Sequence, residues 1–136
     1  MITAVDTAVI LDIFASDPAW GAHSAALLRD CLREGSVVAC EIVWAETAVN
    51  FDVEDKFIGA MSTLGITFSA TNEKAALRSS QAWRQYLRRG GRRQRVVADF
   101  LVGGHALEQA DRLLTRDRGF YRDYFARLKV LDPSTR

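Results

Sequence analysis

The chain has 136 residues, 49% of them hydrophobic and 26% charged, and its net charge is +1. These values are typical of one soluble globular domain with a full core. The apolar start MITAVDTAVILDIF lacks basic residues and contains Asp6 and Asp12, so it does not match a secretion signal, and no later run is apolar enough to span a membrane. We therefore expect a cytoplasmic protein in which Cys31 and Cys40, the only cysteines, are free core thiols.

The small net charge conceals two unlike halves of the chain. Residues 1–55 contain ten acidic and two basic residues, whereas residues 56–136 contain seven acidic and sixteen basic ones. Arginine supplies fifteen of the eighteen basic residues, and guanidinium groups suit bidentate contacts to phosphate. The asymmetry suggests carboxylates that hold a metal ion, flanked by cations that hold phosphate.

Hydrophobic patterning in the first half of the chain predicts short strands separated by helices. In chain order we expect a strand at Ile2–Asp6, a helical turn at Thr7–Ala15, a helix from Asp17 to Gly35, a strand at Val37–Cys40, helices at Glu41–Phe51 and Val53–Leu64, and a strand at Ile66–Phe68. Asp17-Pro18 is a typical helix start, and Gly35 and Gly65 are typical helix stops.

The second half continues the same alternation. We expect a cap at Thr71-Asn72, a long helix to Arg89, a helix at Val96–Ala110, a strand at Arg112–Thr115, a turn or short helix at Arg118–Phe125, and a last strand at Leu128–Leu131. Short strands alternating with helices predict an α/β fold with a parallel sheet covered by helices on both faces. No linker, repeat or nucleotide-binding glycine pattern divides residues 1–136, so we expect a single domain.

Acidic residues fall where such a fold binds ligands. In open α/β sheets, ligands gather beyond the carboxyl ends of the strands. Asp6 ends the first predicted strand, Asp117 follows the strand that ends at Thr115, and Glu46 lies on the helix that leaves the second strand. Each of these acids taken alone is more often a helix cap or a solvated residue than a ligand.

Asp99 is harder to explain as an ordinary surface residue. At helical spacing it shares a stripe with Val96, Gly103 and Ala106, which is the side expected to pack against the protein. A carboxylate there is costly unless it is paired, hydrogen-bonded or bound to a metal. Arg95, four residues earlier, is the alternative partner. Asp99 is thus a candidate metal ligand.

The segments VDTAVIL, EIVWAET, VVADFLVGGHA and LLTRDRGF, in this order, resemble a PIN domain, specifically the VapC-type toxin ribonucleases of bacterial type II toxin–antitoxin modules. The resemblance extends from Ile2 to about Leu131. It implies a three-layer α/β/α fold around a short parallel sheet. The family's four acids match Asp6, Glu46, Asp99 and Asp117, and Thr115 fills its small hydroxyl position. Ala8 departs from the family, which usually has Asn or Ser there, and this puts metal affinity in question.

The chemistry of these residues agrees with the resemblance. Four hard oxygen ligands without histidine or cysteine favour Mg²⁺ or Mn²⁺ over zinc. A bound cation would activate a water for attack on a scissile phosphate and stabilise the leaving 3′ oxygen. We expect Asp6 and Asp99 to be the principal ligands, Glu46 and Asp117 to complete the shell or hold the attacking water, and Thr115 to hydrogen-bond that water.

Basic residues cluster in the segment RQYLRRGGRRQR. Those predicted to follow an RNA backbone are Arg88, Arg89, Arg92, Arg93 and Arg95. The alternative is a solvated helix end whose arginines complement the helix dipole.

Several other conspicuous residues are assigned structural roles. His105 lies about 240° around the helix from Asp99, so it cannot share the site. Glu41 is expected to serve its own helix N-terminus. Asp12 is expected to point away from the cluster. The three tryptophans are expected in the core or at an interface: Trp20, Trp44 and Trp83.

Two other functional classes were weighed. A phosphatase of the haloacid dehalogenase type needs a second acid two residues after its nucleophile, and Ala8 occupies that place after Asp6. A non-catalytic RNA-binding module of the same fold is possible in principle. Retention of all four acids argues against it, because a surface for polyanions has no use for clustered negative charge.

The resemblance also implies partners: an RNA substrate, a cognate small antitoxin protein, and a second copy of the chain in a homodimer. A basic residue of the antitoxin would enter the acidic pocket while its acidic residues meet the arginines. We further expect the exposed faces between Asp17 and Leu64 to offer an apolar groove for an amphipathic helix, lined by Trp20, Trp44, Phe51 and Phe57.

Overall fold

The computed structural model describes residues 1–91 and 97–135. Their elements, in chain order, are β1 (Ile2–Val5), α1 (Thr7–Phe14), α2 (Gly21–Glu34), β2 (Ser36–Ala39), α3 (Glu41–Ala48), α4 (Glu54–Leu64), β3 (Ile66–Phe68), α5 (Glu73–Arg88), α6 (Val97–Gln109), β4 (Arg112–Leu114), α7 (Arg118–Tyr124), β5 (Val130–Leu131) and the 3₁₀ turn η1 (Pro133–Thr135).

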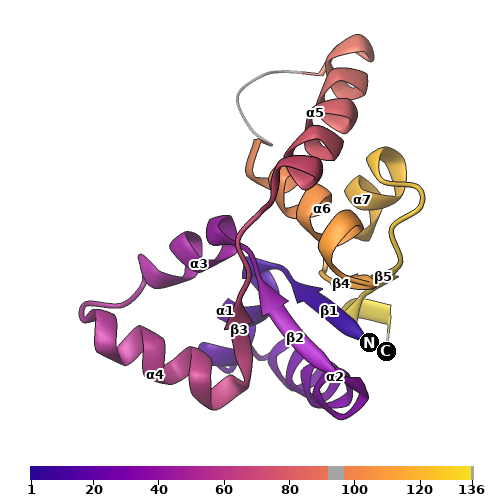
Figure 1. The fold of residues 1–136 in the computed structure, drawn as a ribbon. Helices are drawn as coiled ribbons and strands as arrows, with labels where there is room; N and C mark the ends of the chain where they lie inside the picture. The colour runs from indigo at the N-terminus through magenta and orange to yellow at the C-terminus, as the bar shows by residue number, and fades with distance from the viewer. Residues whose placement is uncertain (92–96, 136) are drawn as a thin grey trace.

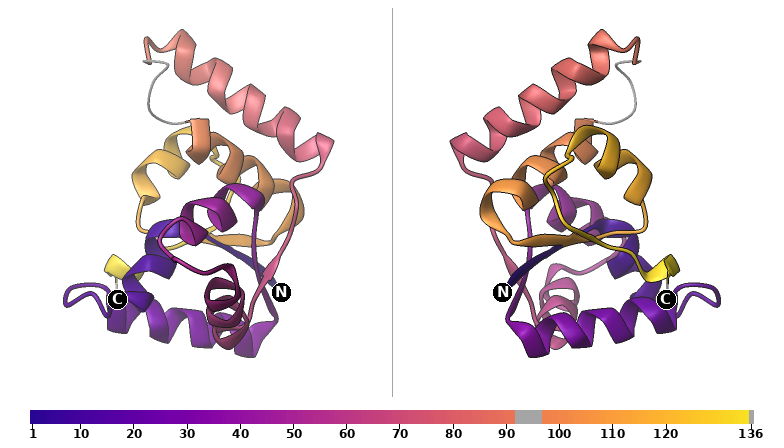
Figure 2. Two further views of the ribbon diagram at one scale, coloured as in Figure 1. Left: turned by 90° about the vertical axis from the view of Figure 1, so that its left-hand side faces the viewer. Right: turned by 90° about the vertical axis from the view of Figure 1, so that its right-hand side faces the viewer.

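The five strands form one parallel sheet in the order β3-β2-β1-β4-β5. Helices α1, α2 and α4 cover one face, and α6 and α7 cover the other, with α5 packed on the outer side of α6 (Figures 1 and 2). Helix α3 lies at the carboxyl end of the sheet and contacts both α1 and α6. The predicted three-layer α/β/α architecture is confirmed.

Local signals explain most of the element boundaries. Asn72 caps α5 by accepting the N–H of Ala75 at 2.9 Å, and Gly65 ends α4 in the left-handed conformation (φ 77°) that glycine adopts without strain. The second helix begins later than expected. Asp17 accepts the N–H groups of Ala19 and Trp20, which closes a separate turn, and the regular helix starts only at Gly21.

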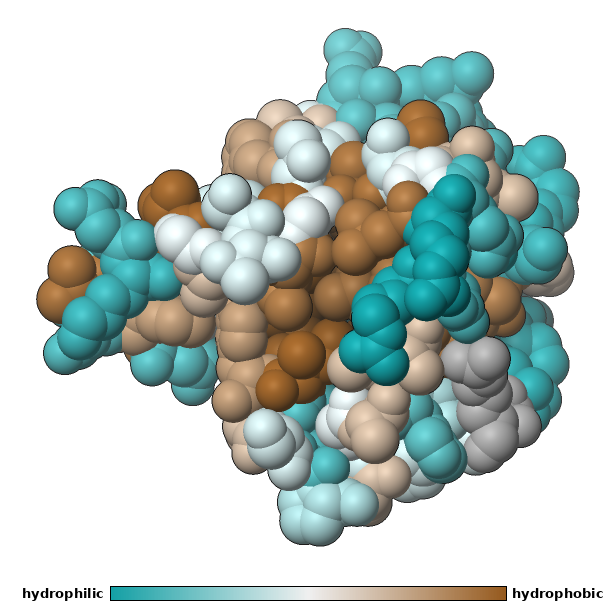
Figure 3. Space-filling model, turned by 90° about the horizontal axis from the view of Figure 1, so that it is seen from below, coloured by the Kyte–Doolittle hydropathy of each residue, from teal (hydrophilic) through white to brown (hydrophobic). Residues whose placement is uncertain are grey.

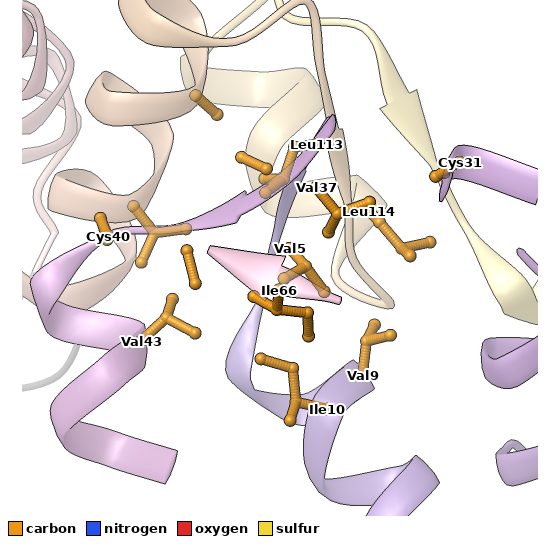
Figure 4. Packing of buried hydrophobic residues seen from close by; sticks show 14 of the residues in the cluster. Val5, Val9, Ile10, Cys31, Val37, Cys40, Val43, Ile66, Leu113 and Leu114 are labelled. Atoms are coloured by element: carbon orange, nitrogen blue, oxygen red, sulfur yellow. The ribbon is translucent and has the colours of Figure 1, made fainter. Parts of the chain in front are cut away.

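The core fills both faces of the sheet. On the α1 side, Val5 and Ile66 meet Val9 and Ile10, and all four are at most 4% exposed (Figure 4). Because successive side chains of a strand point to opposite faces, Leu113 lies on the other side, toward α6. Cys31 and Cys40 are buried free thiols, as predicted.

A buried arginine fastens the amino end of the sheet. Arg112 of β4 donates from Nε to Thr3 Oγ1 at 2.9 Å and forms an ion pair with Glu34 of α2 at 3.2 Å. Its side chain is only 5% exposed. Arg112 therefore links β4 to the neighbouring β1 and to α2, at the end of the sheet opposite the predicted acids.

The outer face of α1, α2 and α4 carries an apolar surface. Figure 3 shows hydrophobic side chains gathered in the middle of this face between hydrophilic flanks. Two hollows of about 340 and 330 Å³ border α1; their apolar linings include Ile13 and Ala22 in one and Leu11, Phe14 and Phe51 in the other.

The predicted lining of this surface was partly wrong. Phe57 is 3% exposed, because it packs edge-on against Trp44 and Phe51 inside the core. Trp44 and Trp20 are half-buried, and Trp44 borders a different hollow beside β3. Side chains of α1, among them Leu11 and Phe14, line the apolar surface where Phe57 was expected. Within the described residues, no helix combines the length and apolar character that a membrane span requires.

Candidate active site

The predicted acids lie at the carboxyl end of the sheet, where the chain leaves β1 and β4 in opposite directions. Strand β1 is followed by α1 on one face, and the neighbouring β4 is followed by α7 on the other (Figure 1). Such a switch point leaves a crevice between two strand ends. Asp6 follows β1 directly, and Asp117 follows β4 after two residues.

Asp6 is held by two hydrogen bonds. It is the N-cap of α1, where its Oδ1 accepts the N–H of Thr7 at 2.8 Å. Its Oδ2 accepts the hydroxyl of Thr115 at 2.7 Å. The backbone N–H of Asp117 in turn donates to Thr115 Oγ1 at 3.1 Å. Thr115, fully buried, thus joins the two acids across the crevice.

The Thr115 hydroxyl has a definite role in this geometry. A hydroxyl has one proton to donate, and Thr115 donates it to Asp6. It therefore orients that carboxylate and accepts from the backbone next to it; its hydrogen bond to an attacking water stays a prediction.

Glu46 reaches the same site from α3. Its Oε1 accepts the hydroxyl of Thr7 at 2.8 Å, and Thr7 is the residue whose N–H binds Asp6. Glu46 is exposed, so its side chain is presented toward solvent at the mouth of the crevice. Thr7, expected only as the start of a helical turn, is the link between the first and second acids.

Asp99 lies half-buried in the first turn of α6. Its position in the cluster is reflected in the electrostatics of Tyr121, a fully buried residue of α7. Burial raises the pKa of the Tyr121 hydroxyl far above its ordinary value, and the negative charges of Asp6, Asp99 and Asp117 raise it further. Three of the four acids therefore act on one buried group. Arg95, the alternative partner of Asp99, is outside the described residues.

The electrostatics of Asp6 are those of a crowded carboxylate. Burial raises the pKa of its carboxyl, the hydrogen bonds from Thr115 and Thr7 oppose that rise, and the charges of Glu46 and Asp117 add to it. Burial also raises the pKa of the neighbouring Cys40 thiol. Clustered carboxylates of this kind are relieved by a cation, and their all-oxygen donor set fits a hard divalent ion.

The side chains are not arranged as a finished metal site. Among the described residues, no three acidic, histidine or cysteine side chains are placed so that they could already hold an ion. Two of the four acids, Glu46 and Asp117, are exposed and can change rotamer, whereas Asp6 is fixed by its two hydrogen bonds. The all-oxygen donor set fits a divalent cation in its chemistry, and exposed side chains would have to turn toward Asp6 to hold the ion.

A buried ion pair supports the loop that carries Thr115 and Asp117. Arg116, between them, pairs with Asp12 of α1 through Nε and Oδ2 at 2.7 Å, and its guanidinium lies 5.5 Å from the ring centre of Trp20. Asp12 thus points away from the carboxylates, as expected, but its charge is committed to the site loop. This support was not predicted; the available signals were an acid on the predicted helical turn, Asp12, six residues after Asp6, and the arginine that precedes Asp117.

A second polar group lies beside the site. His105 is 1% exposed and shares a hydrogen bond of 3.0 Å between its Nε2 and Ser69 Oγ. Burial lowers the pKa of His105, and the charge of Glu41 opposes this. The structural role of His105 is supported. Glu41 does lie in the first turn of α3, but its carboxylate accepts the N–H and the hydroxyl of Thr71, so it joins α3 to the start of α5.

The arginine cluster is described only in part. Arg88 and Arg89 are exposed at the end of α5 that projects beyond the sheet (Figure 1). The guanidinium of Arg89 lies 5.2 Å from the ring centre of Tyr124 on α7. Three of the predicted RNA-binding residues lie outside the described residues: Arg92, Arg93 and Arg95.

A comparison with known protein families shows to which family the chain belongs. The family model of the PIN domain matches residues 3–125, which includes all four acids and Thr115. The chain belongs to the PIN-domain family. PIN domains are generally nucleases, and PIN nucleases typically use divalent metal ions. No curated protein matches the sequence of this PIN domain.

Solved structures share its fold at low sequence identity. A chain of VapBC-1 from nontypeable Haemophilus influenzae superposes with a TM-score of 0.74 at 18% identity, covering 98% of this chain and 99% of that one. A chain of VapBC2 from Rickettsia felis, bound to a DNA fragment from their promoter, gives 0.71 at 15%, covering 97% and 98%. A chain of a toxin–antitoxin complex from Klebsiella pneumoniae gives 0.63 at 20%, covering 96% and 97%.

Proposed function

We propose that this PIN domain is a metal-dependent endoribonuclease that hydrolyses RNA phosphodiester bonds. The observation that carries the proposal is the hydrogen-bond chain that joins Asp6 to Glu46 through Thr7 and to the backbone of Asp117 through Thr115. The charge of Asp99 acts on the buried Tyr121 together with those of Asp6 and Asp117. These carboxylates come from four different elements, and mutual repulsion makes their gathering unfavourable unless it serves a cation. Membership of a family that is generally nucleolytic supplies the reaction class.

Each acid has a role suggested by its setting. Asp6, oriented by two hydrogen bonds, and Asp99, half-buried on α6, would be the principal ligands of Mg²⁺ or Mn²⁺. The exposed Glu46 and Asp117 would complete the shell or hold the attacking water by accepting its protons. The cation, when bound, supplies a water of lowered pKa and stabilises the leaving 3′ oxygen. Thr115 keeps the Asp6 carboxylate in place while charge develops.

The arginine segment is the proposed path of the RNA backbone. Exposed Arg88 and Arg89 precede Arg92, Arg93 and Arg95 in the connection to α6, the helix whose first turn carries Asp99. Because these arginines directly precede Asp99 in the sequence, they suit the binding of a polyanionic substrate next to the proposed metal ligand. The electrostatic contacts carry no base specificity, which depends on pockets for unstacked bases.

Cleavage of total RNA tests the enzymatic proposal directly. Purified protein with Mg²⁺ is incubated with total RNA, and the new ends are mapped by sequencing. EDTA should abolish cleavage, and Asp6→Asn or Asp99→Asn should lower it by at least ~10²-fold. Asp55→Asn, an exposed acid on α4, is the matched control and should cleave normally. Full activity of the Asp99→Asn protein would refute the site assignment.

A non-catalytic RNA-binding module is the second candidate, favoured only by the lack of a finished three-ligand group among the described residues. Heat denaturation with added Mn²⁺ separates the two. A catalytic site should gain stability as the ion is added, whereas a scaffold without an ion site should not.

We further propose that the enzyme is the toxin of a toxin–antitoxin pair, with a small antitoxin as partner. Its fold matches chains of complexes described as VapBC or as toxin–antitoxin. The apolar face along α1, with its two hollows, suits the apolar side of an amphipathic helix (Figure 3). A basic residue of the same partner would be attracted to the carboxylates.

Co-expression tests the toxin proposal apart from catalysis. Expression of the chain alone should arrest growth, and co-expression with the adjacent small open reading frame should restore it. The pair should co-purify with reduced ribonuclease activity. An active enzyme that is harmless to cells would favour a housekeeping RNA-processing nuclease. The expected homodimer is checked by the molar mass of the purified protein in solution.

A further inference from the structure

Tyr121 carries a buried hydroxyl group on which the charges of three of the carboxylates act. It lies in α7 one turn after Asp117, whose backbone oxygen accepts the N–H of Tyr121. Helical side chains lean toward the N-terminus of their helix, so the phenol is directed back toward Asp117 and the end of β4. Its ring is held between Phe120 and Phe125, with ring centres 5.0 and 6.0 Å away. The position of the hydroxyl is therefore well defined.

This hydroxyl is buried in an unusual way. Tyr121 is 0% exposed, and its Oη has no hydrogen-bond partner among the residues that the structure describes. A buried hydroxyl normally has a partner, since leaving it without one is costly. A phenylalanine would fill the same space among the neighbouring rings without that cost. The oxygen atom thus calls for an explanation other than packing.

The surroundings of the hydroxyl indicate what it can do. Burial raises the pKa of the Tyr121 phenol, and the charges of Asp6, Asp99 and Asp117 raise it further, so the phenol stays protonated. A neutral phenol has one proton to donate, and carboxylate oxygens are strong acceptors. The group is a neutral donor in the protein interior that the carboxylate charges reach, whereas Glu46 is exposed to solvent.

We propose that Tyr121 is a positioning residue of the metal site, whose buried hydroxyl donates to an oxygen of the carboxylate cluster, or to a water held by it, when the divalent cation is bound. This inference rests on the proposed function. Residues that hydrogen-bond metal ligands fix the orientation of those ligands and raise metal affinity. A bound cation would draw the carboxylates into one arrangement, and the Tyr121 hydroxyl would then have an acceptor for its proton.

The Tyr121→Phe protein tests the proposal, because it removes a single oxygen atom. The affinity for Mn²⁺ is measured by calorimetry, and the melting temperature is measured without metal. We expect the Mn²⁺ affinity to fall by about 10-fold. The metal-free melting temperature should stay the same or rise, because the unpartnered hydroxyl is gone. Tyr124→Phe, on the same helix but half-buried under Arg89, is the matched control and should change neither quantity.

The outcomes separate this proposal from the proposed function. Unchanged Mn²⁺ affinity in Tyr121→Phe overturns the role of Tyr121 alone. A lower metal-free melting temperature with unchanged affinity overturns it as well and shows a structural hydroxyl. Failure of the wild-type protein to bind Mn²⁺ overturns both the proposed function and the role of Tyr121. Asp6→Asn serves as the reference for a lost ligand.

Discussion

The ion pair between Asp12 and Arg116 should stabilise both the fold and the site loop. The pair is 2.7 Å long, with side chains 9% and 33% exposed. Breaking a fully buried pair costs about 3–5 kcal/mol, but the exposed third of Arg116 can be rehydrated. We therefore expect Asp12→Ala to lower the free energy of unfolding by about 2 kcal/mol. For a chain of this length that corresponds to a fall of roughly 7 °C in Tm.

Urea denaturation of the metal-free protein measures the effect, and a double-mutant cycle with Arg116→Met isolates the pair. The methionine keeps an apolar side chain against Trp20, so the coupling energy, expected at about 1–1.5 kcal/mol, reports the charges. Lys56→Met removes an exposed pair with Asp52 and should cost less than about 0.5 kcal/mol. A coupling energy between Asp12 and Arg116 below about 0.5 kcal/mol, the upper limit expected for the cost of Lys56→Met, would refute the reasoning.

The same pair makes a pH prediction with a definite sign. Burial raises the pKa of Asp12, and Arg116 opposes that rise. In Arg116→Met the opposing charge is gone, so the folded-state pKa rises further above that of the unfolded chain. The folded state then binds protons more strongly, and its stability falls as the pH rises through the folded-state pKa. The deficit of the variant relative to wild type should be larger at pH 7 than at pH 4.

Three further predictions concern the site. Because the pKa of Asp6 is raised, the free energy of unfolding of the metal-free protein should fall as the pH rises above the ordinary aspartate range. Asp6→Asn should weaken that pH dependence and make the protein more stable than wild type at pH 7. Urea titrations at several pH values measure both effects. Thr115→Val should lower cleavage by ~10-fold or more, because it removes the hydroxyl that is hydrogen-bonded to Asp6. Thr115→Ser keeps that hydroxyl and should retain most of the activity. An equal loss of activity in both variants would indicate an effect on packing. Arg88→Ala with Arg89→Ala should make the slope of log K against log salt shallower by roughly 0.7 per lost contact with single-stranded RNA, and an unchanged slope would assign these arginines to a solvated face.

The fold was predictable because its signals are local. Period-2 and period-3.6 patterning, the Asn72 cap and the Gly65 stop lie within a few residues of the elements that they define. The boundaries that moved did so for reasons that patterning does not contain. The turn closed by Asp17 delays α2, and α3 ends at Ala48 because the chain then turns into the segment before α4.

The acids of the site could be predicted from the sequence, but the hydrogen bonds that connect them could not. Their spacing and the family resemblance named Asp6, Glu46, Asp99 and Asp117, but hydrogen bonds between distant residues have no sequence signature. Thr7 was missed for that reason, and Tyr121 was missed because the sequence does not show that its hydroxyl is buried without a partner among the described residues. Phe57 was misplaced because an apolar helix residue can face the core or a groove, and packing against Trp44 decided the matter.

The bond between Thr115 and Asp6 has a consequence for synthesis of the protein. The two residues are 109 positions apart, and β1, which also pairs with β2, lies beside β4 in the finished sheet. At the usual pace of a ribosome, β1 would wait roughly 5–20 s for that partner to be made. Nascent chains would thus carry the first acid without the geometry that orients it. The proposed nuclease would therefore lack an oriented first acid, and with it full activity toward the messenger and the ribosome that produce it, until translation has nearly finished.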